Sequence, residues 1–223
     1  MTHINTLDDL LSNRFSCRAF TSHPVPRDQI ERIINVAKKA PSWCNAQPWQ
    51  VVVTEGPATE NFRAALMAEV KTGSPKLDLE GPEAYPGVYG DRRRTVGWQL
   101  YDAVGVKKGD RAGSANQMLR NFALFDAPHV AILTSPRALG PYGAMDSGGF
   151  VLAFTLAARA LGIDTIPQAA VANYAGFVRK YFGIGDDRIM LCAISFGYAD
   201  HDHPANSFTT ERAPLGDIVD WRS

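Results

Sequence analysis

Apolar residues recur at helical spacing in several stretches of the chain. In "RDQIERIINVAKKA", Ile30, Ile33 and Ile34 follow the i, i+3, i+4 pattern of one buried helix face, and Pro41 ends the helix. Thr6 is suited to cap a short helix before it. Pattern and composition together predict helices at residues 7–14, 27–40, 59–73, 91–104, 111–125, 143–162 and 171–184.

Four stretches rich in β-branched residues have the composition of buried strands. They are "WQVVVTEG", "PHVAILTS", "IDTIPQ" and "RIMLCAISFGYA". Helices outnumber strands and do not alternate with them regularly, so we expect an α+β fold rather than a doubly wound parallel sheet. With a length of 223 residues, the chain is expected to form a single domain over residues 1–223.

Two segments fit neither pattern. Residues 73–92 are dense in Pro and Gly and contain Tyr85 and Tyr89. Because a loop this long inside a compact domain is usually functional or disordered, and disordered linkers avoid aromatic residues, we expect residues 73–110 to form a lid or insert over a substrate. The tail, residues 199–223, is mostly irregular, and its amphipathic "LGDIVDW" has no nearby segment to pack on.

Composition narrows the class of protein. Hydrophobic residues make up 45% of the chain, enough for a full core, and the formal net charge is +0, so no field attracts nucleic acid or anionic lipid. Cys17, Cys44 and Cys192 form no CxxC pair and suggest neither disulfides nor a zinc site. With no apolar leader and no run of ~18 apolar residues, we expect a cytoplasmic protein with no membrane partner.

Arg14, Ser16 and Arg18 alternate strictly in "RFSCRAF". In an extended chain they project to one side, and guanidinium and hydroxyl groups are good phosphate ligands. An isolated R-x-S-x-R also fits a solvated strand edge. The sequence has no P-loop and no G-x-G-x-x-G after a strand, so a phosphorylated cofactor would depend on side chains, including Arg212 of the tail.

A second stretch, "APSWCNAQPWQVVV", puts the polar side chains of Ser42, Asn45 and Gln47 between a helix and a strand, which alone fits an ordinary turn. Together with "RFSCRAF" it resembles the FMN-dependent nitroreductase family. Further segments are similar to the branch that reduces nitroarenes such as nitrobenzene and nitrobenzoate: "YPGVYGDRRRTVGWQLYDAVGVKKGD", "NFALFDAPHVAIL", "GIDTIPQAAVANYAGFVRKYFGI" and "ERAPLGDIVDW".

The resemblance implies a nitroreductase-like fold, with a central, mostly antiparallel sheet flanked by helices. It also implies a homodimer with two FMN sites at the subunit interface, in which each C-terminal segment is exchanged onto the partner. That exchange would give "LGDIVDW" the packing surface that it lacks in its own chain.

The resemblance assigns roles to individual residues. Arg14, Ser16, Arg18 and Arg212 would contact FMN, with Arg14 and Arg212 on the phosphate. A second group would come from the partner subunit and border the flavin ring, with the Trp of this group also shaping the substrate pocket: Pro41, Ser42, Trp43 and Asn45.

Two further segments are assigned in the same way. "IPQAA" matches the segment that packs on one flavin face, where a backbone N–H near Ala169 would point at flavin N5 and no side chain would be catalytic. Its cofactor-binding residues would be Pro167, Gln168, Ala169 and Ala170. Near the pyrimidine edge, either Arg120 or Asn121 would contact the ring; an arginine there would stabilise the reduced anionic flavin.

The function implied is an FMN-dependent NAD(P)H nitroreductase. NADH or NADPH would deliver hydride, and a small nitroaromatic, or a quinone-type acceptor, would then take the same place in a ping-pong cycle. Reductive dehalogenation and enone reduction within the family remain alternatives. A metal-binding hydrolase built on Asp200, His201 and His203 is an alternative of another class, but an H-x-H on a loop usually marks a solvated turn, so no metal is expected.

Overall fold

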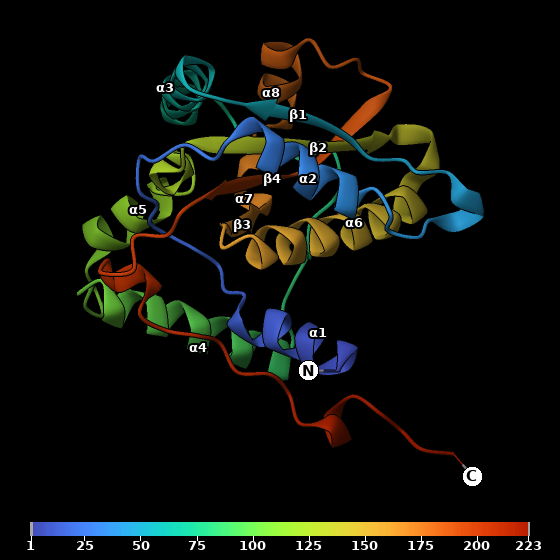
Figure 1. Cartoon of the computed structure of the whole chain (residues 1–223). Helices are drawn as coiled ribbons and strands as arrows, with labels where there is room; N and C mark the ends of the chain where they lie inside the picture. The colour runs from blue at the N-terminus through green and yellow to red at the C-terminus, as the bar shows by residue number, and fades with distance from the viewer. Residues whose placement is uncertain (1, 223) are drawn as a thin grey trace.

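A four-stranded antiparallel sheet forms the centre of the computed structural model, which describes residues 2–222 (Figure 1). The strand order is β1-β2-β4-β3. The bounds are β1 Gln50–Thr54, β2 His129–Pro136, β3 Asp164–Gln168 and β4 Arg188–Gly197. The predicted α+β class and the antiparallel sheet are confirmed.

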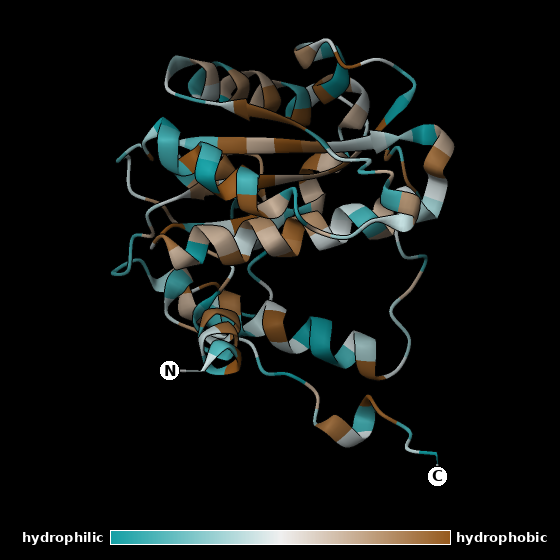
Figure 2. Cartoon of the chain, turned by 45° about the vertical axis from the view of Figure 1, so that its right-hand side comes forward, coloured by the Kyte–Doolittle hydropathy of each residue, from teal (hydrophilic) through white to brown (hydrophobic). Residues whose placement is uncertain are grey.

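Both faces of the sheet are covered by helices, because successive side chains of a strand point to opposite sides. On β2, Ala131 and Leu133 belong to the core under α2 and α6, whereas Val130 and Ile132 belong to the core under α3, α7 and α8. The bounds of these helices are α2 Arg27–Ala37, α3 Pro57–Thr72, α6 Gly140–Ala160, α7 Ala169–Ala172 and α8 Ala175–Phe182. Figure 2 shows the strands as largely hydrophobic between these two helical layers.

Three helices lie outside this core and bury no side chain completely. They are α1 His3–Asn13, α4 Val88–Ala103 and α5 Arg111–Leu119. Figure 1 places α1 and α4 below α6, with the C-terminal segment running past them and away from the body. Short 3-10 turns complete the structure: η1 Trp43–Asn45, η2 Leu124–Asp126, η3 Arg137–Leu139, η4 Pro204–Asn206 and η5 Leu215–Asp217.

The bounds of the predicted helices all shift by some residues, and three of them show the reason for the difference. The first begins at His3 because the side chain of Thr2, rather than Thr6, accepts the capping hydrogen bond. The helix predicted to reach residue 125 ends at Leu119 and is followed by the left-handed turn η2. The helix predicted at 171–184 is broken into α7 and α8.

The segment after α1 is extended but belongs to the sheet only through one contact. Ser16 forms a single parallel bridge with Thr165 of β3, and the N–H of Cys17 donates to the Thr165 carbonyl at 3.1 Å. Cys17 and Phe20 are buried and fix this segment against the body. Within residues 2–222, no helix has the length and apolar character needed to cross a membrane.

Candidate functional site

A cavity of about 830 Å³ opens between the segment after α1, helix α6 and the tail. Arg14, Ser16 and Arg18 line it together, as the alternation predicts, and Arg212 reaches it from the other end of the chain. Asp8 is the one carboxylate in the lining. Burial, and then the nearby positive charge of Arg212, lower the pKa of Arg14, while burial lowers that of Arg18. The site therefore concentrates positive charge that an anion would relieve.

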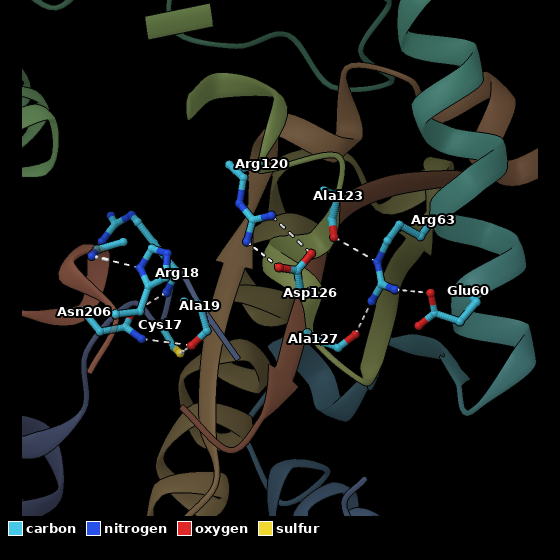
Figure 3. Close-up of polar contacts among 12 residues, drawn as sticks. Cys17, Arg18, Ala19, Glu60, Arg63, Arg120, Ala123, Asp126, Ala127 and Asn206 are labelled. Atoms are coloured by element: carbon cyan, nitrogen blue, oxygen red, sulfur yellow. Dashed lines mark hydrogen bonds and ion pairs between the residues drawn. The ribbon is translucent and has the colours of Figure 1, made fainter. Parts of the chain in front are cut away.

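Asn206 connects the arginine segment to the C-terminal part of the chain, as Figure 3 shows. Its Oδ1 accepts the backbone N–H of Arg18 at 2.7 Å, and its Nδ2 donates to the Ala19 carbonyl at 2.9 Å and the Asp200 carbonyl at 2.8 Å. The Arg18 guanidinium lies over the ring of Phe208 at 5.6 Å. Neither Asn206 nor Phe208 was identified from the sequence, because their partners are almost two hundred residues away in the chain.

A second cavity of about 580 Å³ shares Ser16, Arg18 and Pro167 with the first. The segment at the end of β3 and the start of α7 forms one wall, and α4, α5 and the turn after α5 contribute most of the other residues. The predicted residues Pro167, Gln168, Ala169 and Ala170 lie in this wall, and Asn121 lines the cavity from the turn after α5. The two adjoining cavities provide one end lined by Arg14, Arg18 and Arg212 and another end of mixed polar and aromatic character.

The side chain of Gln168 is buried and fixes the backbone of this wall. Its Oε1 accepts the Ser195 hydroxyl at 2.5 Å, and its Nε2 donates to the Asn121 carbonyl at 2.7 Å. Gln168 therefore contributes to the cavity mainly through the position of its main chain, while its amide holds β3, β4 and the turn after α5 together.

Of the two candidates near the pyrimidine edge, the structure brings Asn121 to the second cavity and turns Arg120 away from it. Arg120 lines a different cavity and pairs with Asp126 at 2.7 Å (Figure 3). The sequence left both residues as candidates, because the helix was predicted to continue to residue 125 whereas α5 ends at Leu119. The left-handed turn changes the register and brings Asp126 within reach of Arg120.

The turn expected to border the ring does not line either cavity of its own chain. The backbone N–H of Trp43 donates to both carboxylate oxygens of Asp146 at 3.1 Å, and its ring packs on Tyr142 at 5.2 Å. The Ser42 hydroxyl accepts the N–H of Gln47 at 2.9 Å. Pro41, Ser42, Trp43 and Asn45 thus lie beside the N-terminal part of α6, away from Arg14 and Arg18.

Backbone strain gathers in two segments, of which only the second reaches the candidate cavities, through Phe125. Within residues 2–222, every non-glycine residue with a positive φ falls in one of them. They are Cys44, Asn45 and Gln47 in the first turn, and Leu124, Phe125 and Asp126 in the second, with φ between 48° and 63°. Left-handed backbone costs about 1–3 kcal/mol per residue and tends to occur at functional sites.

Tyr85 and Tyr89, predicted to touch the substrate, are both exposed and line neither of the two cavities. The aromatic residues that α4 contributes to the second cavity are instead Trp98 and Tyr101. Tyr85 lies against Arg93, a lining residue, with the guanidinium carbon 5.4 Å from the ring centre. The sequence pointed to Tyr85 and Tyr89 but does not show which face of α4 lines the cavity.

The "DHDHP" segment forms a hydrogen-bonded turn. Asp200 accepts the N–H of Asp202 at 3.1 Å, and Nδ1 of His203 accepts the N–H of Ala205 at 3.1 Å. No cluster of three potential metal-ligating side chains, at Asp200, His201 and His203 or elsewhere, occurs in residues 2–222.

Cys17 stands between Ser16 and Arg18 in the sequence, and its thiol is buried. Burial raises the pKa of Cys17 to about 12, which keeps its thiol protonated at neutral pH.

Comparison with known proteins agrees with this geometry. A sequence model of the "Nitroreductase family" matches residues 11–198. Chloronitrobenzene nitroreductase of Comamonas testosteroni is 33% identical over 96% of this chain and 95% of its own, and 4-nitrobenzoate reductase of Pseudomonas putida is 31% identical over 92% and 90%. The crystal structure of FMN-dependent nitroreductase NfnB from Mycobacterium smegmatis in complex with NADPH is 30% identical, with a TM-score of 0.95 over 100% of both chains.

Proposed function

Because the chain belongs to the nitroreductase family, we propose that it is an FMN-dependent NAD(P)H oxidoreductase that reduces nitroaromatic compounds. The observation that carries the proposal is the convergence of Arg14, Ser16, Arg18 and Arg212, from both ends of the chain, on one cavity. Relatives of similar length whose names describe nitroarene reduction support the choice of substrate class.

The donor set fits a flavin mononucleotide. Two arginines and a hydroxyl make charge-assisted hydrogen bonds to a phosphate without a glycine-rich turn. The second cavity continues from Arg18 along a wall of small residues, Ala169 and Ala170, against which a flat ring system can pack. When bound there, FMN would supply two-electron hydride transfer between a nicotinamide and an acceptor.

The residues of the chain would orient the cofactor and the acceptor and exclude water, and no side chain would act as a nucleophile. Gln168, held by Ser195 and Asn121, fixes the backbone at Ala169, whose N–H would be available to the bound ring. Asn121 and Arg18 line the same cavity, where they would supply a polar side chain and a positive charge to that ring. Positive charge beside the ring would stabilise the reduced state by preorganised electrostatics.

The second cavity would admit the nicotinamide ring and the acceptor in turn, which is the basis of a ping-pong cycle. A nicotinamide that binds only transiently over the flavin requires no dinucleotide-binding domain, which agrees with the absence of a G-x-G-x-x-G motif after a strand in the sequence. Quinones, enones and halogenated aromatics are further acceptors that the same cavity could take.

The proposal includes a homodimer in which each subunit completes the other's site. Two observations support it. The turn with Trp43 and Asn45 is strained yet lines no cavity of its own chain, and the tail exposes Leu215, Ile218 and Trp221 by 64%, 68% and 80%. Apolar side chains gathered on one exposed segment mark an interaction surface.

Anaerobic stopped-flow tests the proposed activity. The purified protein should be yellow, should bleach on mixing with NADPH or NADH, and should regain its colour with nitrobenzene or 4-nitrobenzoate. Quinone, enone and iodoaromatic acceptors are compared under the same conditions. A protein that is bleached by nicotinamide and recoloured by none of the nitroarenes contradicts the proposed substrate class, and a colourless one contradicts the proposed cofactor.

A further inference from the structure

The wall that α4 presents to the second cavity carries positive charge that the FMN site does not require. Arg93 and Arg94 line this cavity together with Arg18, and no Asp or Glu is among its lining residues. Arg18 already belongs to the wall at which the flavin is proposed to bind. The charge on α4 therefore faces the space that remains for a second ligand.

The two arginines of α4 differ in how far their charge is already neutralised. Arg94 pairs with Asp91 one turn earlier on the same helix. Within residues 2–222, Arg93 has no carboxylate at ion-pair distance, and its planar group lies on the ring of Tyr85 at 5.4 Å. Stacking holds a guanidinium by its face and leaves the N–H groups at its edge free to bind an anion.

Aromatic residues stand beside this charge in the same space. Trp98 and Tyr101 from α4 and Phe125 from the strained turn line the cavity. A ligand with an acidic group attached directly to an aromatic ring would pair its acid with the arginine and pack its ring on the aromatic side chains. The phosphate of a dinucleotide is instead separated from its reacting ring by a ribose and further phosphates.

We propose that this cavity selects aromatic acceptors that carry a carboxylate, with Arg93 binding the carboxylate and Tyr85 positioning Arg93. This inference rests on the proposed function and narrows it: among the nitroarenes, acidic compounds such as nitrobenzoates would be preferred over neutral ones. Tyr85, predicted from the sequence to contact the substrate, would act through Arg93 rather than directly.

The ratio of two specificity constants tests the proposal. 4-Nitrobenzoate and nitrobenzene share the ring and the nitro group and differ in the carboxylate. In R93Q, the ratio of kcat/KM for the acid to kcat/KM for the neutral compound should fall by about 10-fold or more, since a hydrogen bond between charged groups is lost. R92Q is the matched control: Arg92 precedes Arg93 on the helix, pairs with Asp217 at 3.6 Å and does not line the cavity, so the ratio should not change.

Benzoate, which cannot be reduced, gives a readout independent of turnover. Titrated calorimetrically into the oxidised holoenzyme, it should bind more tightly than benzyl alcohol, and R93Q should remove that preference. Y85A should weaken benzoate binding, and Y85F, which keeps the stacked ring, should restore it. Binding of benzoate that depends on Arg93, in a protein that reduces no nitroarene, would support the site and contradict the proposed function.

Two results overturn the inference. The first is an equal fall of kcat/KM for both acceptors in R93Q, which would mean that Arg93 serves the flavin or the fold. The second is a lower ratio of kcat/KM for NADPH to kcat/KM for NADH in R93Q than in the wild type, with the acceptor ratio unchanged, which would assign Arg93 to the dinucleotide phosphate.

Discussion

At the scale of single residues, the sequence predicted that Arg14, Ser16 and Arg18 lie together, because an extended chain places alternate side chains on one side. Arg212 was a candidate as a further cation of the tail, and the family resemblance assigned it to the phosphate. Asn206 was not predicted. A side-chain amide that bonds the backbone of a segment 188 residues away leaves no local pattern. The choice between Arg120 and Asn121 depended on the register of one turn, which the sequence does not show.

His129 provides a pH-dependent contact between three segments. Its Nε2 accepts the N–H of Val25 at 2.9 Å, so the neutral ring carries its proton on Nδ1, which donates to the Thr54 carbonyl at 3.2 Å. Burial is the main reason why its pKa is lowered. An unfolded histidine therefore takes up a proton at a higher pH than the folded one, and the stabilisation is complete above about pH 6.5 and is lost as the pH falls through the folded pKa.

We expect the free energy of unfolding of the wild type to fall between pH 7 and pH 5 by more than that of H129N, which has no ring to protonate. Urea denaturation at several pH values measures both. His201 is exposed, so H201N serves as the control and should retain the wild-type slope. Equal slopes for wild type and H129N would show that the acid sensitivity has another origin.

At the scale of elements, the strands agreed with prediction because their β-branched runs are buried on both faces, whereas the end of α5 did not. "NFALFD" has helix-compatible residues, but tertiary contacts hold Leu124 to Asp126 in the left-handed region. Arg63 of α3 donates to the Ala123 carbonyl at 2.9 Å and the Ala127 carbonyl at 2.5 Å, on either side of the turn (Figure 3). The burial of Phe125 adds to this restraint.

Removing Arg63 should release this turn. R63A leaves two carbonyls without their charged donor and is expected to lower the free energy of unfolding by about 2–4 kcal/mol. R27A removes a surface arginine that pairs with Glu55 at 2.5 Å, and should cost less than about 1 kcal/mol. Chemical denaturation compares the two; a loss in R63A no larger than in R27A would mean that the turn is held by Phe125 alone.

At the scale of the whole molecule, the described chain is a sheet with two helical layers to which α1, α4 and the tail are loosely attached. Hydrophobic patterning predicts the layered body well, since each face is covered by segments of the same chain. Patterning does not predict the position of the tail or of the turn at Trp43; in the proposed dimer, part of their packing surface would belong to the partner subunit.

Shortening the chain after Pro214 tests that arrangement. The variant lacks the exposed Leu215, Ile218 and Trp221 but retains Arg212. Sedimentation velocity should show wild-type dimers and a concentration-dependent shift toward monomers in the shortened protein, together with weaker flavin binding. The triple substitution of Leu215, Ile218 and Trp221 by Ser should give the same shift. A shortened protein that remains fully dimeric contradicts a role for the tail in assembly.

The central claim is that cationic groups from both ends of one polypeptide hold a single phosphate. Its most direct measurement is the dissociation constant of FMN from apoprotein, obtained by fluorescence titration for wild type and R14A/R212A, with riboflavin as the ligand without phosphate. The double substitution should weaken FMN binding at least about 100-fold and leave riboflavin binding nearly unchanged. Equal affinity of FMN for both proteins would contradict this claim.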